Sequence, residues 1–429
     1  MLTKEDNELL VRTGPGTPMG NLFRRYWIPA LLSGELPVSD CVPVRVKLLG
    51  EKLIAFRDSQ GEIGLIDEYC AHRKVSLYFA QNKECGLRCP YHGWKFDVHG
   101  QCVDMPSEPP SSNFKDKVRL KSYPCREQGG VIWTYMGPQE EMPSFPEMEW
   151  VTLPENQTFI SKRLQKTNYA QAMEGGIDSS HVSFLHSDIT LWNPARKKSL
   201  LTKVMDDTAP QFFIEPTDYG MMIGARRNTE NDKYYWRITQ WLFPWYTLIP
   251  PSNDEPIGGH AWVPIDDENV FTWSFNFHPT RSLTKEEINE FKSGYGIHVP
   301  VIPNTFIPVQ NMENDYLIDR DLQKSVSISG IKGIGSQDQA MQESMGPIVD
   351  RSTEKLGTSD TAVITMRRLL MKAARNLQAG GKAPGLDSQS QRVRSTSVVL
   401  PKDESWIEAT KEARIASKTT FRPSNGEIK

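Results

Sequence analysis

Two short clusters of cysteine and histidine lie close together in the first quarter of the chain. Cys70 and His72 are separated by one residue, Cys89 and His92 by two, and sixteen residues lie between His72 and Cys89. Two thiolates suit one ferric iron of a [2Fe–2S] cluster and two imidazoles suit the other, which raises the reduction potential above that of an all-cysteine cluster. The spacing therefore predicts such a cluster, held by two loops.

Other uses of the same residue types fit this pattern less well. A structural zinc site usually spaces its pairs as Cys-x-x-Cys and His-x3–5-His rather than Cys-x-His. A disulfide between Cys70 and Cys89 leaves both histidines without a role, and unrelated surface residues rarely pair twice. Zinc stays open as the main alternative.

A second group of candidate ligands lies at residues 178–186. Two neutral imidazoles and one carboxylate on one face of Fe(II) leave positions open for O2 and substrate, and His181 and His186 can supply the imidazoles. Their spacing of five residues corresponds to about 140° around a regular helix, so His186 should lie past a helix end or a distortion. Asp178 is one turn before His181 on the same face and can orient that imidazole. A helix with two hydrogen-bonded histidines is the alternative.

The elements that hold the first cluster are predicted to be strands. From residue 42 apolar residues alternate with others, and two short apolar runs follow, separated by the turn signal Ser59-Gln60-Gly61. A further strand is expected in GGVIWTYMG, so residues 40–137 are predicted to form a small β domain. The proline-rich segment 138–150 is the expected boundary.

The second half of the chain mixes strands and helices. The segments YYWRITQWLF (234–243) and VFTWSFNFH (270–278) have the aromatic and β-branched content of strands. Thr284 and Glu287 form a capping-box signature that opens a short helix, and a longer helix is expected over 360–378, ended by Gly380-Gly381. Residues 383–396 are expected to form a loop, followed by a polar tail.

Composition limits the classes of protein that the chain can belong to. A length of 429 residues suits two domains, and a net charge of −3 gives no general attraction to nucleic acid or anionic membranes. The start MLTKEDNELL does not resemble a secretory signal, and no apolar stretch is long enough to span a bilayer. With six cysteines in a chain of this size, we expect a cytoplasmic protein that uses cysteine for metal ligation.

The first cluster resembles a Rieske motif, with Gly93-Trp94 in the form found in ring-hydroxylating oxygenases. Respiratory Rieske proteins carry an extra cysteine in each loop, and this chain has Lys74-Val75 and Gly93-Trp94 in those regions. The resemblance implies that the cluster ligands are Cys70, His72, Cys89 and His92. Three other cysteines match no ligand position and are expected to be small buried hydrophobes: Cys85, Cys102 and Cys125.

The second cluster resembles the mononuclear iron motif of the same family, Asp-x2-His-x4-His. The resemblance implies that His181 and His186 bind iron, and that Asp178 bridges a Rieske histidine and an iron histidine across a subunit boundary. It also implies a distal aspartate, for which Asp338 has the expected separation and opens a predicted helix. The competitors for that role are Asp319, Asp321 and Glu343.

The resemblance extends over nearly the whole chain and is to the phthalate dioxygenase group of Rieske oxygenases. It is carried by GPGTPMGNLFRRYW, VPVRVKLLGE, CPYHGWKFDVHGQCVDMPSEPP and AMEGGIDSSHVSFLHSD. It implies an α+β fold, with a β-sandwich Rieske domain inserted near the N-terminus of a helix-grip catalytic domain. We expect residues 1–137 to hold the N-terminal segment and the Rieske domain (core about 27–137), and residues 138–429 the catalytic domain.

The resemblance implies the oxygenase component of a multicomponent enzyme. The chain has no G-x-G-x-x-G fingerprint for a dinucleotide, so NADH electrons are expected through a separate reductase with flavin and a plant-type [2Fe–2S] cluster. A head-to-tail ring, a homotrimer or stacked hexamer, is implied. The expected reaction is hydroxylation of an aromatic carboxylic acid of the phthalate or benzoate type. The alternative is O-demethylation of a methoxylated lignin-derived aromatic acid.

The substrate contacts stay open at this point. Arg226, Arg227 and Arg237 are candidates for a carboxylate, but surface salt bridges are the better explanation for any one of them, so no substrate residue is assigned. Aromatic side chains could line an apolar pocket but are more often core: Trp241, Trp245 and Phe184. Three other functions compete: a pure electron-transfer protein, a zinc-stabilised binding module, and an oxygenase with a non-aromatic substrate.

Overall fold

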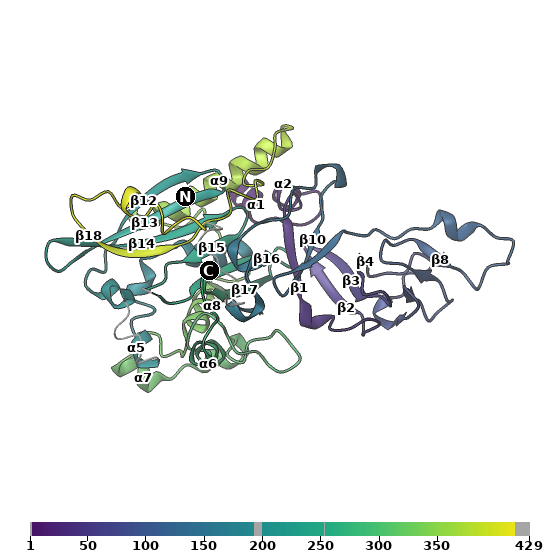
Figure 1. Ribbon diagram of the computed structural model, residues 1–429, viewed down its shortest axis with the longest axis horizontal. Helices are drawn as coiled ribbons and strands as arrows, with labels where there is room; N and C mark the ends of the chain where they lie inside the picture. Colours follow the sequence, from purple (N-terminus) through teal and green to yellow (C-terminus); the bar gives the residue numbers. More distant parts are fainter. Residues whose placement is uncertain (1, 193–199, 253, 417–429) are drawn as a thin grey trace, which may run out of the picture.

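The structure is a computed structural model that describes residues 2–192, 200–252 and 254–416. It has an elongated shape with two lobes (Figure 1). The smaller lobe is built from the short strands β1 to β10, and the larger one from a wide sheet with its helices.

The smaller lobe contains three small antiparallel sheets. Strands β2 and β3 form a hairpin whose turn residues Leu49 and Gly50 both have positive φ, at 46° and 80°, as a two-residue hairpin of type I′ requires. The lobe has a hydrophobic cluster of its own around Phe56, Trp94 and Phe96. The strands are β1 (Trp27–Leu32), β2 (Val44–Leu48), β3 (Glu51–Arg57), β4 (Ile63–Asp67), β5 (Gln81–Asn82), β6 (Leu87–Arg88), β7 (Lys95–Phe96), β8 (Cys102–Asp104), β9 (Cys125–Gln128) and β10 (Val131–Tyr135).

The larger lobe is organised around one antiparallel sheet in the order β11-β17-β16-β15-β14-β13-β12, with β18 paired to β14. Its central strands are buried along most of their length, which explains their aromatic and β-branched content. The strands are β11 (Thr158–Gln165), β12 (Gln211–Thr217), β13 (Gly220–Thr229), β14 (Lys233–Leu242), β15 (Tyr246–Ile249), β16 (Ile257–Pro264), β17 (Val270–Phe277) and β18 (Thr396–Pro401).

Helices pack against this sheet and against each other. The predicted capping box is present, since Thr284 and Glu287 exchange hydrogen bonds at the start of α6. The predicted long helix is α9, which buries one apolar face and ends before Gly380, whose φ is +86°. The helices are α1 (Lys4–Val11), α2 (Pro18–Phe23), α3 (Glu149–Thr152), α4 (Tyr169–Ile177), α5 (Ile189–Trp192), α6 (Lys285–Ser293), α7 (Arg320–Ser325), α8 (Ile334–Ser344), α9 (Thr361–Gln378) and α10 (Trp406–Ala409).

The N-terminal helices α1 and α2 pack on α9 of the larger lobe (Figure 1). The Tyr169 hydroxyl donates to the carbonyl of Leu10 at 2.7 Å, and the Asn168 side chain donates to the carbonyl of Val11 at 3.0 Å. The strands of the smaller lobe therefore interrupt the larger one in sequence. This confirms the predicted α+β fold with a β domain inserted near the N-terminus; the boundary between residues 137 and 138 stays a prediction.

Two sequence predictions about local structure were wrong. Residues 396–401 are strand β18 rather than the beginning of a polar tail, because they complete the hydrogen bonding of β14. Cys102 is buried as expected, but Cys85 and Cys125 are only partly buried. The rest of the predicted tail, residues 417–429, lies outside the described residues. Among the described helices, none is long and apolar enough to cross a membrane.

Candidate metal centres

Two turns of equivalent geometry carry the cysteine and histidine pairs of the smaller lobe. In each, the cysteine N–H donates to the carbonyl five residues later, at 2.9 Å from Cys70 and 2.8 Å from Cys89. In each, the N–H four residues later donates back to the cysteine carbonyl at 3.0 Å. That fourth residue has positive φ in both turns: Lys74 at 59° and Gly93 at 78°. Local backbone hydrogen bonds thus shape each turn.

The two turns place thiols inside the lobe and imidazoles toward its surface. Cys70 and Cys89 are each 2% exposed and form no disulfide, and burial raises the pKa of the Cys70 thiol to about 11. The ring centroids of His72 and His92 are 4.4 Å apart, and Trp94 stacks on His72 at 4.5 Å. This pairing of like groups matches a cluster in which one iron takes both thiolates and the other both imidazoles.

A single metal ion fits these four side chains poorly. Within the described residues, the only set of three or more potential ligands whose atoms lie within 4.8 Å of one another is His181, His186 and Asp338. The four side chains of the smaller lobe are thus spread more widely than the ligands of one zinc ion at about 2.0–2.3 Å bond lengths. The spread fits a two-iron cluster.

The other candidate ligands follow the end of α4. The helix ends at Ile177, Asp178 is its C-cap, and His181 opens a single 3-10 turn that ends at Ser183. Beyond this turn lies His186, as its spacing predicted. The expectation that Asp178 and His181 share a helix face was wrong, because the turn after the helix brings Asp178 to His181.

Three ligand atoms from distant parts of the chain converge here. The Nε2 atoms of His181 and His186 are 3.2 Å apart, and Oδ1 of Asp338 is 3.6 Å and 3.2 Å from them. Asp338 lies within α8 rather than at its start. The competing acids are used elsewhere: Asp319 caps α7, Asp321 is exposed, and Glu343 accepts from Gln339 and the Lys166 N–H.

The outer nitrogen of each imidazole identifies its tautomer. His181 Nδ1 is 3.2 Å from the Asp178 carboxylate, and His186 Nδ1 is 2.7 Å from Oε1 of Gln337. Both partners accept hydrogen bonds, so both histidines carry the proton on Nδ1 and turn the lone pair of Nε2 inward. Two lone pairs and the carboxylate of Asp338 then face one another with no donor between them. This arrangement fits a metal cation.

The charge of the site also favours a cation. Although burial alone would raise it, the pKa of Asp338 is lowered to about 2 by the imidazoles of His186 and His181. Burial opposes the charged form of His181, but its hydrogen bond to Asp178 and the nearby Asp338 raise its pKa. Both carboxylates therefore stabilise positive charge at this position.

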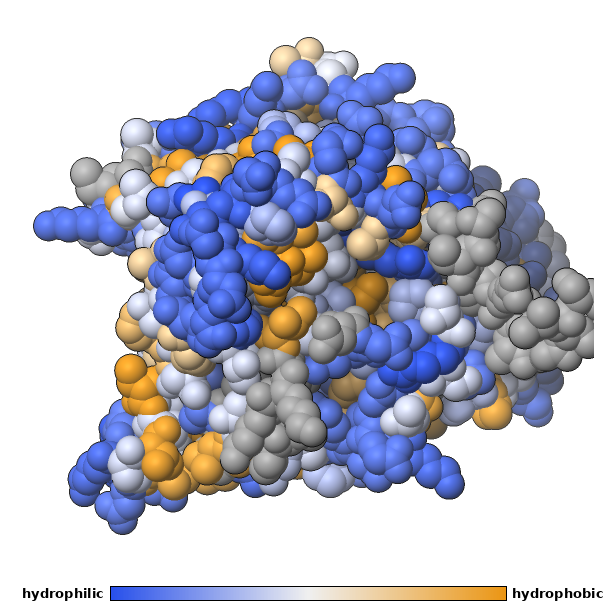
Figure 2. All heavy atoms as spheres, turned by 60° about the vertical axis from the view of Figure 1, so that its left-hand side comes forward, coloured by the Kyte–Doolittle hydropathy of each residue, from blue (hydrophilic) through white to orange (hydrophobic). Residues whose placement is uncertain are grey.

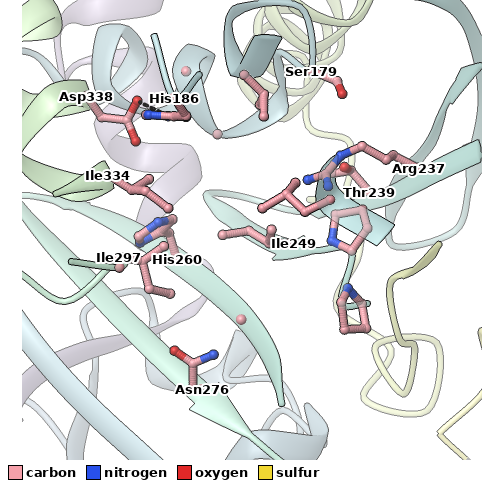
Figure 3. A pocket seen from close by; sticks show the side chains of 18 of the residues that line it. Ser179, His186, Arg237, Thr239, Ile249, His260, Asn276, Ile297, Ile334 and Asp338 are labelled. Carbon is pink, nitrogen blue, oxygen red and sulfur yellow. Dashed lines mark ion pairs between the residues drawn. The ribbon is translucent and has the colours of Figure 1, made fainter. Parts of the chain in front are cut away.

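A cavity of about 260 Å³ adjoins the three candidate ligands. Figure 3 shows His186 and Asp338 on one side of it, and Arg237 and Thr239 on the opposite side. An apolar cavity of about 150 Å³ accepts benzene, so this one accommodates a substituted aromatic ring. Burial lowers the pKa of His260 to about 3, so its imidazole lines the cavity in the neutral form.

Only one of the three candidate arginines faces this cavity with its charge uncompensated. Arg226 contacts Gln211 and the ring of Tyr234, away from the cavity, and Arg227 donates to the carbonyl of Ser179. Arg237 is 6% exposed, and among the described residues no hydrogen bond or ion pair joins its guanidinium group to another side chain or carbonyl. The predicted pocket aromatics are elsewhere: Trp241 and Trp245 are core residues and Phe184 is 53% exposed.

An open groove of about 680 Å³ reaches the candidate ligands from outside. Asp178, His181 and Asp338 line it, together with exposed apolar side chains such as Phe184 and Met341. The face of the larger lobe in Figure 2 is hollowed, with hydrophobic residues visible between hydrophilic surfaces. The carboxylate of Asp178 is 26% exposed, so it can be reached from the groove while it holds His181.

Comparison with known proteins identifies the families to which the two lobes are similar. Residues 26–124 match the Rieske [2Fe-2S] domain family, and residues 134–425 match the family described as LigXa C-terminal domain like. The chain is 42% identical to the 3-chlorobenzoate-3,4-dioxygenase oxygenase subunit of Comamonas testosteroni, over 97% of this chain and 99% of that protein. It is 40% identical to the phthalate 4,5-dioxygenase oxygenase subunit of Pseudomonas putida, over 95% and 94%.

The chain is also similar to a more distant relative and to a solved structure. The 5,5'-dehydrodivanillate O-demethylase oxygenase subunit of a Sphingobium species is 30% identical over 89% of this chain and 82% of that protein. A solved oxygenase–ferredoxin complex of carbazole 1,9a-dioxygenase has the same fold, with a TM-score of 0.56 and 20% identity over 84% of this chain and 93% of that one. The chain therefore belongs to the Rieske non-heme iron oxygenases, as an oxygenase subunit whose cofactors are a Rieske [2Fe–2S] cluster and a mononuclear iron.

Proposed function

We propose that this subunit hydroxylates an aromatic carboxylic acid of the phthalate or benzoate type. The proposal rests on one observation: three convergent ligand atoms border a cavity whose far side holds the buried guanidinium of Arg237. A buried charge without a partner is costly, and a substrate carboxylate would compensate it through a bidentate contact. Two relatives are named for chlorobenzoate and phthalate, which are also aromatic carboxylates.

We propose the following ligand assignment. The cluster is held by Cys70, His72, Cys89 and His92, and the mononuclear iron by His181, His186 and Asp338. When bound, the cluster supplies single electrons and the iron activates O2 at positions that the protein leaves open. The protein's own contribution is to orient the imidazoles through their Nδ1 protons and to hold the aromatic ring beside the iron by its carboxylate.

Asp178 is proposed to link one subunit to the next. Its carboxylate holds His181 and lies in the open groove. The exposed His72 follows β4 of the smaller lobe, and β4 lies apart from α8 in Figure 1. A Rieske histidine of a neighbouring subunit can therefore contact Asp178 more directly than one of the same chain. This favours a head-to-tail ring, a homotrimer or a stacked hexamer.

Electrons are proposed to come from NADH through a separate reductase in the cytoplasm, because the chain has no dinucleotide fingerprint. O-demethylation is the second candidate reaction, since one relative is named for it. The same ligands serve both reactions, and the position of the substrate relative to the iron decides between them.

The test is turnover of a panel of aromatic acids, each paired with its methyl ester, by the holoenzyme with a surrogate reductase. We expect acids to be oxidised and esters to be poor substrates. Arg237→Gln should raise KM for acids by about 10- to 100-fold, while the control Arg226→Gln, on the same sheet but away from the cavity, should not. Equal rates for acids and esters would contradict the carboxylate assignment.

A further inference from the structure

The two candidate iron histidines are oriented by chemically different partners. His181 is held by the carboxylate of Asp178, which is partly exposed. His186 is held by the neutral side-chain amide of Gln337, which is 1% exposed and precedes Asp338 on α8. Neighbouring residues of one helix therefore contact opposite nitrogens of the same imidazole, with Gln337 at Nδ1 and Asp338 at Nε2.

The orientation of the Gln337 amide is determined by its surroundings. Its Nε2 is surrounded by acceptors: the Asp188 carboxylate at 3.0 and 3.2 Å, Ser329 Oγ at 3.1 Å and the Ile331 carbonyl at 2.9 Å. A flipped amide would place its oxygen against the Asp188 carboxylate and the Ile331 carbonyl. Oε1 must therefore face His186, and His186 must donate from Nδ1.

The network continues into the interior. Asp188 is 4% exposed, and its carboxylate accepts hydrogen bonds from the Ser327 hydroxyl and from Gln337. The amide thus separates the carboxylate of Asp188 from the imidazole that it orients. Outer hydrogen-bond partners of this kind change metal affinity by about 10- to 100-fold when they are removed.

We propose that Gln337 is a positioning residue for the mononuclear iron, and that Asp188 acts through it. The amide keeps His186 in the Nδ1-protonated form, and Asp188 keeps the amide in the orientation that does so. This inference rests on the proposed iron ligands. On the interior side of the site the orienting group is then the neutral amide of Gln337, whereas on the groove side it is the carboxylate of Asp178.

The first experiment measures the affinity of the mononuclear site for Fe(II). The cluster-loaded chain is titrated anaerobically with Fe(II) in competition with a chromophoric ferrous chelator. Gln337→Met keeps the side-chain length and removes the amide, and should weaken Fe(II) binding by about 10- to 100-fold. Gln339→Met is the matched control, because Gln339 is an equally buried glutamine of α8 that bonds Glu343 instead.

A double exchange tests the network without changing its net charge. In Gln337→Glu combined with Asp188→Asn, the carboxylate contacts His186 directly, and the new asparagine can donate to it. Fe(II) affinity should recover at least tenfold relative to Gln337→Met, and the reduction potential of the bound iron should fall because the negative charge is closer. The Rieske spectrum and the thermal midpoint verify that each variant is folded.

The outcomes separate this inference from the proposed iron site. If His186→Ala leaves Fe(II) binding intact, the ligand assignment itself fails. If His186→Ala abolishes binding while Gln337→Met binds as tightly as Gln339→Met, only the positioning role fails. No recovery in the folded double variant would also overturn it.

Discussion

The two metal regions of this molecule are constructed in opposite ways. In the smaller lobe, two neighbouring turns provide all four candidate ligands, and each turn is shaped by backbone hydrogen bonds within six residues. In the larger lobe, the candidate ligands come from the segment after α4 and from α8, and side chains such as Asp178 and Gln337 orient them.

This difference separates locally determined from globally determined geometry. A turn keeps its shape as long as its own backbone bonds form. The larger lobe needs the sheet, α4 and α8 in place before His186 and Asp338 approach each other. Substitutions in the two regions should therefore have separable effects on metal content.

The largest effects are expected when a candidate metal ligand of either region is replaced. Asp338→Ala should lower iron from about three to about two per chain and remove turnover, because the remaining ligands are two neutral imidazoles. The Rieske signal in electron paramagnetic resonance should persist. Cys89→Ser should do the reverse and lose the cluster signal. Loss of both centres in either variant would mean that the two regions are not independent.

Asp178→Asn should affect the link between the regions. An amide in place of the carboxylate leaves a polar group beside His181 but removes its negative charge, and turnover should fall by about 100-fold or more. Metal analysis should find both centres retained. Normal turnover in this variant would exclude Asp178 from electron transfer.

Glu174 tests how far the larger lobe depends on distant packing. Its carboxylate, on a side chain that is 14% exposed, bonds Arg351 and Arg367, and Arg351 also bonds Asn7 of the N-terminal segment. Glu174→Gln leaves the buried guanidinium of Arg351 without a charged partner among the described residues, while Arg367 keeps Glu354, and should cost about 3 kcal/mol of unfolding free energy. In the control Glu8→Gln, which removes the exposed pair with Arg12, the change should stay below about 0.5 kcal/mol. Chemical denaturation measures both.

The same network gives a pH dependence. Burial alone would raise the pKa of Glu174, but Arg351 and Arg367 lower it. A carboxyl with a lowered pKa in the folded state contributes stability above its unfolded value of about 4.3, and this contribution is lost as the pH falls through the folded pKa. Unfolding free energy should therefore decrease below about pH 4.3 more steeply in the unsubstituted chain than in Glu174→Gln.

The smallest effects are expected when the left-handed positions of the two turns in the smaller lobe are replaced. Lys74 occupies a left-handed position where the equivalent turn has Gly93. Lys74→Gly should relieve up to about 1 kcal/mol of strain and raise the temperature at which the cluster bleaches. Gly93→Ala should lower that temperature, because an added Cβ would lie 2.5 Å from Cγ of Pro106. Equal responses at the two positions would show that the turns are not equivalent.

The difference between locally and globally determined geometry also explains which features could be predicted from the sequence. The two turns, the capping box of α6 and the apolar face of α9 depend on neighbouring residues, and all were predictable. Asp338 was found only by its separation in a family resemblance, since Asp319, Asp321 and Glu343 are the same kind of group. The role of Gln337 gave no signal except its position beside Asp338.

The features that could not be predicted from the sequence depend on the tertiary environment. Arg226, Arg227 and Arg237 are indistinguishable in sequence, and only packing around the sheet leaves Arg237 in the cavity without a described partner. Strand β18 was missed because its hydrogen bonds go to β14, far away in sequence. The turn that brings Asp178 to His181 was mistaken for a continuous helix because the spacing of the two residues fits both.

The packing of α1 and α2 against α9 has a consequence for how the chain is made. These helices are synthesised well before their partner α9, which is among the later elements of the described chain. The smaller lobe, with its own hydrophobic cluster and all four candidate cluster ligands, is complete long before that. Because domains generally fold as units during synthesis, the two lobes are expected to fold in a fixed order. The smaller lobe can therefore fold before α9 is synthesised, and the packing of α1 and α2 on α9 is completed afterwards.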